Sequence, residues 1–257
     1  MRSIWKGSIG FGLVNIPIKL YSAVQSSTLS MDMLDSRDHA RIKYQRINEN
    51  TRKEVPYEKI VKGYKLEDDY IILDDQDFAD ASPEKSKTVE IENFVQLKDI
   101  NPMYYETSYY AEPEAQGKKA YALLLKALQK SGKAGVARFV LRSSESLCVI
   151  FPLDKVIVIS RIRFAEEIRS FEEIATPDDI SIGKKELEVG LALIDQYTGP
   201  FDIEKFKDEY TSELLNIIKL KAKGKRPTIK KLKPKKAASD DLLDQLMQSL
   251  NTTRKGA

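Results

Sequence analysis

Basic side chains at alternate positions are the first feature of this sequence that suggests a ligand. Arg41, Lys43 and Gln45 alternate with the apolar residues Ile42 and Tyr44. In an extended strand the members of one set share a face and stand about 6.5–7 Å apart. Neighbouring phosphates on one strand of DNA have roughly that spacing. The pattern therefore predicts a ribbon that follows a sugar-phosphate backbone without reading bases.

The charges of the chain are segregated along its length. Residues 37–65 hold nine basic and four acidic residues, whereas residues 66–114 hold three basic and fourteen acidic ones. Residues 219–236 hold ten lysines and arginines and no acid. A chain divided in this way can present a positive face to a polyanion and repel it elsewhere. For residues 37–65 alone, a solvated charged face that binds nothing explains the cluster equally well.

We expect basic residues from these stretches, together with two lysines ahead of a later strand, to contact nucleic acid. Around the first stretch they are Arg41, Lys43, Arg46, Arg52, Lys53, Lys62, Lys85 and Lys87. In the second they are Lys219, Lys221, Lys223, Lys225, Arg226, Lys230, Lys231, Lys233, Lys235 and Lys236. Salt should weaken such contacts steeply. The sequence carries no helix-turn-helix, zinc-finger or basic-zipper pattern for base readout.

Acidic residues crowd the stretch from Asp68 to Asp77 and allow an alternative, a metal-dependent nuclease. Such an enzyme needs carboxylates that converge from separate elements. Here they lie in one loop and at one helix start, where capping by Asp74 and Asp75 explains them. A single histidine, His39, excludes a multi-histidine metal site within one chain. We therefore expect no catalytic residue, no metal and no cofactor.

An apolar stripe lies beyond the basic stretch. Ser239, Asp240 and Asp241 predict the start of a short helix over residues 239–251. Its apolar positions are Leu242, Leu243, Leu246, Met247 and Leu250. A helix of about a dozen residues is marginal alone in water, so the stripe either recruits a partner or docks back on its own chain. The sequence leaves both possibilities open.

Strands must position most of these residues. Residues 4–21 contain two apolar strand-like runs, and Gly7, Gly10 and Gly12 mark a bend or a close backbone approach. A first strand that bends and turns into a second is typical of a small closed barrel. The glycine spacing fits neither the Rossmann nor the P-loop pattern. Further strands are expected at residues 29–34, 41–47, 70–73, 88–92, 103–110, 135–141, 147–151 and 155–162.

Helices are expected at fewer places. A helical turn should lie within residues 53–66, a short helix should follow Asp74, and a longer one should span residues 116–130 before Gly132. Two amphipathic helices follow Thr176, the second capped by Asp202, and they must pack on the barrel or on a partner. The tyrosines of residues 103–110 fit a core or an interface better than a base-stacking platform.

The bulk composition limits the setting. Hydrophobic residues make up 42% of the 257 residues, enough for an ordinary core. No apolar run is long enough for a membrane span, and no signal pattern opens the chain. A single cysteine, Cys148, lies in an apolar run and fits a buried small hydrophobe in a reducing cytoplasm.

Four stretches resemble the bacterial Ku family, the DNA-end-binding proteins of non-homologous end joining. They are residues 4–21, 53–64, 82–91, and 119–124 taken with 137–142. The resemblance covers most of residues 2–170 in the right order. It implies an α+β, mainly β fold. In that fold a Ku-type β-barrel core spans residues 1–175 with a DNA-encircling β bridge at about 37–95. A helical C-terminal arm (176–218) and a flexible basic tail (219–257) follow.

The resemblance also implies a function without catalysis. Two copies would form a ring that threads onto linear double-stranded DNA ends and recruits and stimulates a multi-domain end-joining DNA ligase. The setting would be the cytoplasm, at the nucleoid, and the set from Leu242 to Leu250 would be a candidate ligase contact. Family members often carry a Cys-x-x-Cys whose positions correspond here to Asn48 and Thr51, so no zinc is expected. A generic accessory protein with a cationic tail remains an alternative.

Overall fold

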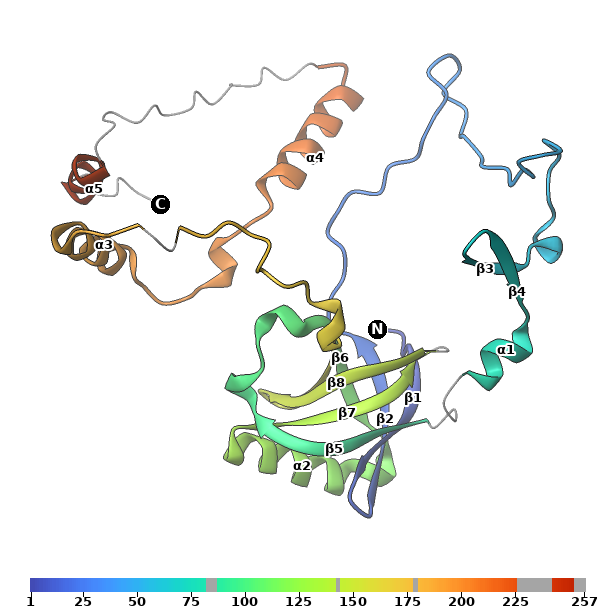
Figure 1. Ribbon diagram of the computed structural model, residues 1–257, viewed down its shortest axis with the longest axis horizontal. Helices are drawn as coiled ribbons and strands as arrows, with labels where there is room; N and C mark the ends of the chain where they lie inside the picture. The colour runs from blue at the N-terminus through green and yellow to red at the C-terminus, as the bar shows by residue number, and fades with distance from the viewer. Residues whose placement is uncertain (82–86, 142–143, 178–179, 226–241, 252–257) are drawn as a thin grey trace. The chain divides into compact units, whose positions relative to one another are not determined.

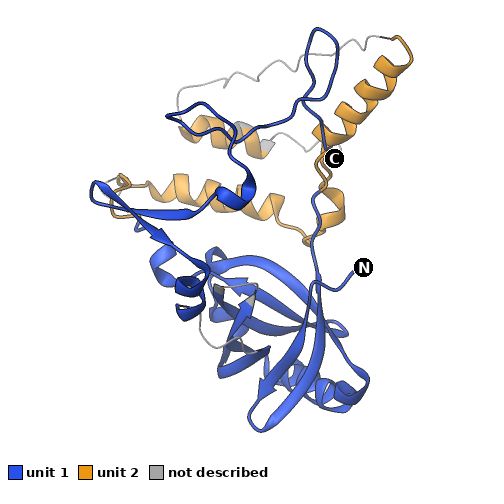
Figure 2. Ribbon diagram, turned by 90° about the vertical axis from the view of Figure 1, so that its right-hand side faces the viewer, with its two compact units in different colours: residues 1–26, 30–170 blue, residues 27–29, 171–257 orange. Residues whose placement is uncertain are grey.

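The computed structural model describes residues 1–81, 87–141, 144–177, 180–225 and 242–251 (Figure 1). The chain separates into two compact units (Figure 2). Unit 1 comprises residues 1–26 and 30–170, and unit 2 comprises residues 27–29 and 171–257. Each unit is described separately below.

Seven strands of unit 1 form a closed barrel in the order β1-β2-β6-β9-β8-β7-β5 (Figure 1). The strands are β1 Trp5–Phe11, β2 Val14–Ser22, β5 Thr88–Gln96, β6 Tyr105–Pro113, β7 Lys133–Leu141, β8 Ser144–Leu153 and β9 Val156–Ile162. Neighbouring strands are antiparallel except β1 and β5, which run parallel and close the barrel. The predicted mainly β barrel and its final three-stranded meander are confirmed.

Alternation along the strands builds the core of the barrel. Ile16, Ile18 and Leu20 of β2 are fully buried, as are Ile157 and Ile159 of β9. Side chains two residues apart share one face of a strand, so the alternate residues Ile16, Ile18 and Leu20 all point inward from β2. The pattern of apolar residues therefore fixes which face of each strand is turned inward.

The predicted close backbone approach in β1 is confirmed at Gly7, whereas at Gly10 the close neighbour is a side chain. A Cβ atom on Gly7 would lie 2.1 Å from the carbonyl oxygen of Lys87, and one on Gly10 would lie 1.9 Å from the Glu90 carboxylate. The Ser8 amide donates to the same Lys87 carbonyl at 2.8 Å. Gly12 has φ +58° in the turn to β2. Gly7 and Gly10 thus leave room beside β1 for Lys87 and Glu90, where the chain enters β5.

One long helix, α2 (Lys118–Ser131), packs on the barrel. Tyr121, Leu124 and Leu128 are buried, and Gly132 ends the helix at φ 64° as predicted. The Tyr121 hydroxyl donates to the Ala111 carbonyl oxygen at 2.7 Å and accepts from the Ile157 amide at 2.7 Å. The helix is therefore bonded to strands β6 and β9. Short 3-10 turns lie at η2 Leu97–Asp99, η3 Pro102–Tyr104, η4 Ala115–Gly117 and η5 Ala165–Glu167.

The segment between β2 and β5, residues 23–87, is called the bridge segment below. It contains η1 Tyr57–Lys59, the hairpin of β3 Lys62–Leu66 and β4 Asp69–Leu73, and α1 Asp75–Asp80. The strand at 70–73, the helical turn and the capped helix are confirmed, although Gly63 lies within β3. The strands predicted at 29–34 and 41–47 are wrong. Single pairings, Leu34 with Arg41 and Ile47 with Glu54, replace them, because no neighbouring strand supplies a ladder.

Helices are the regular secondary structure of unit 2 over its described residues. It contains α3 Lys184–Tyr197, η6 Ile203–Lys205, α4 Glu209–Ala222 and α5 Leu242–Asn251, and α3 contacts α5. The cap predicted at Asp202 begins the short turn η6, whereas Asp208 caps α4 by accepting from the Thr211 amide at 2.9 Å. The Thr211 hydroxyl also donates to Asp208, and this bond, together with the one from the Thr211 amide, holds the pKa of the Asp208 carboxyl below its usual range. Helix α4 also extends beyond Ile218, the predicted end of the arm.

Candidate nucleic-acid interface

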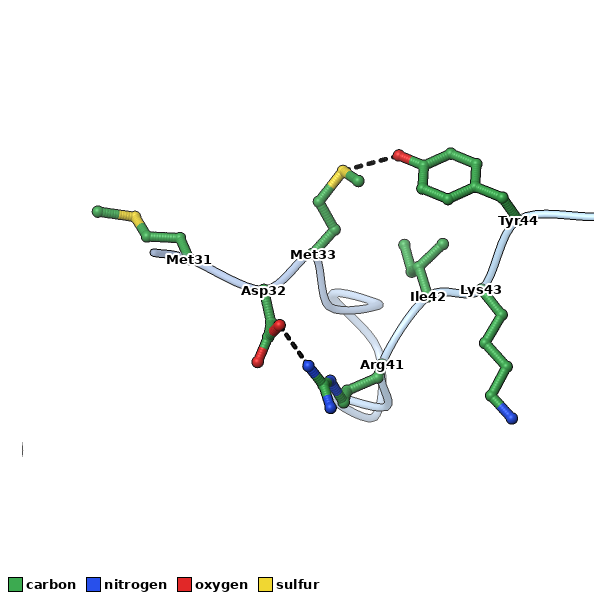
Figure 3. A pocket seen from close by; sticks show the side chains of 7 residues that line it. All are labelled: Met31, Asp32, Met33, Arg41, Ile42, Lys43 and Tyr44. Carbon is green, nitrogen blue, oxygen red and sulfur yellow. Dashed lines mark hydrogen bonds and ion pairs between the residues drawn. The ribbon is translucent and has the colours of Figure 1, made fainter. Parts of the chain in front are cut away.

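Basic side chains of the bridge segment project from an extended loop. Figure 3 shows Arg41 and Lys43 on one side of the chain and Ile42 and Tyr44 on the other. The Tyr44 hydroxyl donates to the sulfur of Met33 at 3.3 Å, which turns the apolar set toward the returning chain. The predicted alternation of faces is thus confirmed here, although the residues form no strand. These side chains line an open pocket of about 330 Å³ with Met31 and Asp32.

Arg41 is paired with a carboxylate that the sequence pattern did not reveal. Its guanidinium donates to Asp32, and the two side chains are 72% and 60% exposed. An ion pair this exposed contributes about 0–1 kcal/mol, because water and salt screen it. A phosphate can therefore compete with Asp32 for Arg41. Lys43 has no ion-pair partner among the described residues.

Three further basic side chains lie in or beside a polar turn at residues 48–51. The Asn48 side-chain oxygen accepts from the amides of Asn50 and Thr51 at 3.0 and 2.9 Å, as predicted for a turn at this point. Arg52 follows with φ 56° and donates its amide to the Asn48 carbonyl oxygen at 2.9 Å. Arg46 and Lys53 flank the turn. All three cations are exposed on a tip whose backbone bonds are satisfied locally.

Aromatic rings hold two of the predicted cations. The guanidinium carbon of Arg46 lies 5.3 Å from the ring centre of Tyr57, and the ammonium of Lys62 lies 4.4 Å from that of Phe78. Cation–π contacts at exposed sites are worth about 0.5–1 kcal/mol and leave N–H groups available. The rings thus restrict these side chains without neutralising them. Sequence reasoning missed Tyr57 and Phe78 in this role, because their partners lie eleven and sixteen residues away.

The remaining predicted contacts are divided between the two units. Lys87 is exposed immediately before β5, and Lys85 lies outside the described residues. In unit 2, Lys219 and Lys221 occupy the last turn of α4, Lys223 is its C-cap, and the Lys225 amide donates to the Leu220 carbonyl oxygen at 2.9 Å. The members of the basic stretch outside the described residues are Arg226, Lys230, Lys231, Lys233, Lys235 and Lys236.

Carboxylates of the acidic stretch in the bridge segment cap the N-terminus of helix α1. The Asp74 carboxylate accepts from the amides of Gln76 and Asp77, and the Asp77 carboxylate accepts from the Asp74 amide at 2.8 Å. Side chain Gln76 donates to Asp80 at 2.6 Å. Over the part of the chain that the structure describes, no group of three or more histidine, cysteine or carboxylate side chains is arranged to hold a metal ion. The capping explanation for Asp74 is confirmed.

The aromatic and apolar candidates take different positions. Tyr109 is buried in the barrel core, and the ring of Tyr105 packs edge-on against Phe151, as a core role predicts. The apolar stripe of α5 is split: Leu242 and Met247 are exposed, whereas Leu243, Leu246 and Leu250 are partly buried. None of the described helices is both long and apolar enough to cross a membrane.

Most of the barrel lies within the part of the chain that matches a known protein family. Residues 10–189 match the family model described as the Ku70/Ku80 beta-barrel domain. The chain belongs to the Ku family. Among its relatives, the non-homologous end joining protein Ku of Bacillus subtilis is 38% identical over 99% of this chain and 83% of its own. The Ku proteins of Coxiella burnetii and Archaeoglobus fulgidus are 35% and 37% identical, over 97% and 90% of their own lengths.

Membership of the Ku family fits the order of elements along the chain. The matched range begins within β1, includes the whole bridge segment and ends within α3. The barrel and the excursion from it therefore belong to one family pattern. The predicted resemblance is confirmed over a longer range than its motifs covered.

Proposed function

We propose that this chain binds ends of double-stranded DNA without sequence preference and acts in non-homologous end joining. Its relatives carry the printed name of that process. The observation that carries the proposal is the bridge segment, which leaves the barrel after Ser22 and returns at Thr88 with its described cations exposed. Contacts from flexible, exposed cations to phosphates supply affinity and register but carry no base information.

We further propose that two copies encircle the duplex. The described bridge residues include no buried side chain. The β3–β4 hairpin in particular exposes the large apolar side chains of Tyr64, Tyr70 and Ile72. In unit 2, Leu187, Leu191 and Ile194 of α3 are likewise exposed. Apolar surface of this extent is typical of an interface. A closed ring of two chains explains a preference for ends without chemistry, since a duplex enters a ring only through a free end.

The proposed role is that of a scaffold without catalysis. It presents DNA ends in the cytoplasm, at the nucleoid, and recruits and stimulates the end-joining ligase. The exposed residues Leu242 and Met247 of α5 support a contact with that ligase. The basic residues from Lys219 onward add sequence-independent contacts to flanking duplex.

The test compares linear duplex with a covalently closed circle of the same sequence in a band-shift assay at two salt concentrations. We expect binding to the linear form, weakened steeply by salt, and little binding to the circle. A mass measurement in solution should give two copies. A monomer, or equal capture of circles, would overturn the proposal.

A second candidate is a generic accessory protein that binds through its cationic tail. The charge of residues 219–236 favours it. Deleting residues 219–257 separates the two: a ring predicts retained but weaker binding to linear duplex, whereas tail binding predicts loss. Product formed from linear DNA on addition of divalent metal would instead favour the nuclease.

A further inference from the structure

An apolar groove lies on the barrel beside α2. It has a volume of about 230 Å³ and is lined by Phe11, Phe94, Leu124, Ala127, Leu128, Ser131 and Lys133. That is below the volume of about 300–1,000 Å³ typical of sites for drug-sized ligands. The groove therefore suits single side chains of a peptide better than a whole small molecule.

The groove has a rigid floor and an open mouth. Leu124 and Leu128 form the floor and are 1% and 2% exposed. The rings of Phe11 and Phe94 meet edge-on with centres 5.8 Å apart, and Phe94 is 39% exposed. Ala127 is exposed on α2. Because the floor belongs to the barrel core, the cavity is pre-formed and binding would cost little ordering.

One lysine lines this apolar groove, and others lie along the helix beside it. Helix α2 contains four lysines and no acidic residue, and Lys133 follows it at the edge of the groove. Lys130 lies one turn beyond Ala127 on the same side of the helix. None of these lysines forms an ion pair within the described parts of the chain. Of the polar lining groups, the Ser131 hydroxyl is bonded to the Leu128 carbonyl oxygen at 3.3 Å.

The groove lies at one defined end of the barrel. Phe11 ends β1, Gln96 ends β5 and Lys133 begins β7 at this end. The strand ends that lead into the bridge segment and unit 2, Ser22 and Ile162, lie at the opposite end. The surface is therefore separate from the strand ends that connect to the proposed DNA contacts.

We propose that this groove binds an acidic amphipathic segment of a partner protein. An apolar side chain of the partner enters between Phe94 and Ala127, and its carboxylates face Lys130 and Lys133. Nucleic acid is the poorer fit, because six of the seven lining residues are uncharged and five are apolar. The charge around the groove selects acidic partners, while the apolar floor supplies contact area.

The probe is a fluorescein-labelled helical peptide with leucine and phenylalanine on one face and glutamate on the other. Binding to the full chain is followed by fluorescence anisotropy. Ala127→Glu places a carboxylate in the groove beside Lys130 and Lys133, where it competes with the carboxylates of the probe for these lysines and repels them, and should weaken binding at least about 10-fold. The matched control is Ala122→Glu, at an exposed alanine of α2 outside the groove, which should change affinity less than about 3-fold. Equal effects of both variants would overturn the groove as the site.

A second measurement uses the unmodified chain, so it does not depend on folding of a variant. A photoreactive group on the apolar face of the probe should cross-link to residues 118–133 or to the strands that hold Phe11 and Phe94. Cross-links spread over other surfaces would contradict the proposal.

A single-stranded oligonucleotide of equal charge that binds more tightly and is weakened by Ala127→Glu would assign the groove to nucleic acid instead. Linear-duplex binding by Ala127→Glu should stay unchanged, which separates this test from that of end binding.

Discussion

The barrel and the bridge segment have opposite relations to solvent. Every residue classed as buried in the described structure lies between Ser8 and Ser160, in the barrel or in the turn and helix packed on it. Among the described residues of 23–87, none is buried, although the hairpin of β3 and β4 is rich in apolar residues. A two-stranded hairpin is at best marginally stable alone in water. The barrel therefore has a core of its own, whereas the described bridge residues form none.

Because of this contrast, we expect barrel side chains to determine the stability of the fold and bridge side chains to determine binding. Removal of a barrel side chain leaves a cavity in a packed core. Removal of a bridge side chain changes only a surface unless a second molecule covers it. Substitutions in the two regions should therefore differ in their effects on unfolding and on DNA binding.

Truncation should be costly in the barrel and nearly neutral in the bridge segment. Ile150→Ala should lower the free energy of unfolding by about 2–5 kcal/mol, because Ile150 is fully buried. Ile72→Ala, at an exposed isoleucine of β4, should change it by at most about 0.5 kcal/mol at low chain concentration. Urea unfolding at several concentrations measures both, and a cost for Ile72→Ala that appears as concentration rises would indicate burial in a second copy. If Ile150→Ala and Ile72→Ala lowered the free energy of unfolding equally at low chain concentration, the contrast between barrel and bridge segment would be contradicted.

The point where the bridge segment rejoins the barrel should be sterically sensitive. Gly7→Ala should lower the free energy of unfolding by about 2–3 kcal/mol, since its Cβ would meet the backbone of Lys87 and the Trp5 ring. Gly10→Ala is the matched variant, and it should cost about 1 kcal/mol or less because a flexible Glu90 side chain can move away. Thermal unfolding compares the two. A larger loss at Gly10 would contradict the proposed close approach.

Two bridge cations should affect DNA affinity without affecting stability. Replacing both Arg46 and Lys62 by alanine should weaken linear-duplex binding about 10-fold and reduce the salt slope by about 2. Replacing Lys119 and Lys126 of α2 by alanine is the control, matched in charge, and should leave both quantities unchanged. Titrations at several salt concentrations provide the comparison. Equal losses for the two pairs would indicate binding by net charge alone.

Burial raises the pKa of the Cys148 thiol far above its ordinary value. The unfolded chain ionises near pH 8.5 while the folded chain keeps its proton, so stability is fully present below that pH and falls above it. At pH 9 the loss should be about 0.8 kcal/mol. Cys148→Ala has a constant cavity cost and should lack this component of the slope. Unfolding measured between pH 7.5 and 9.5 checks it, and identical slopes would show that the thiol is accessible.

The strands of the barrel, helix α2 and the turn at Asn48 could be predicted from local sequence patterns. Alternation, helical periodicity and capping are local, and each follows from residues within a few positions. The same locality explains why Arg41 and Lys43 share a side as predicted. The order of motifs was also sufficient to indicate the Ku family.

Contacts between distant segments determine which of the predicted elements form. The strands predicted at 29–34 and 41–47 require a ladder from another strand, and no described neighbour provides one. The pairing of Arg41 with Asp32 and the rings beside Arg46 and Lys62 depend on how the chain folds back on itself. The parallel pairing of β1 with β5 joins residues about eighty positions apart and closes the barrel. Such contacts arise from packing between distant segments, so no local pattern specifies them.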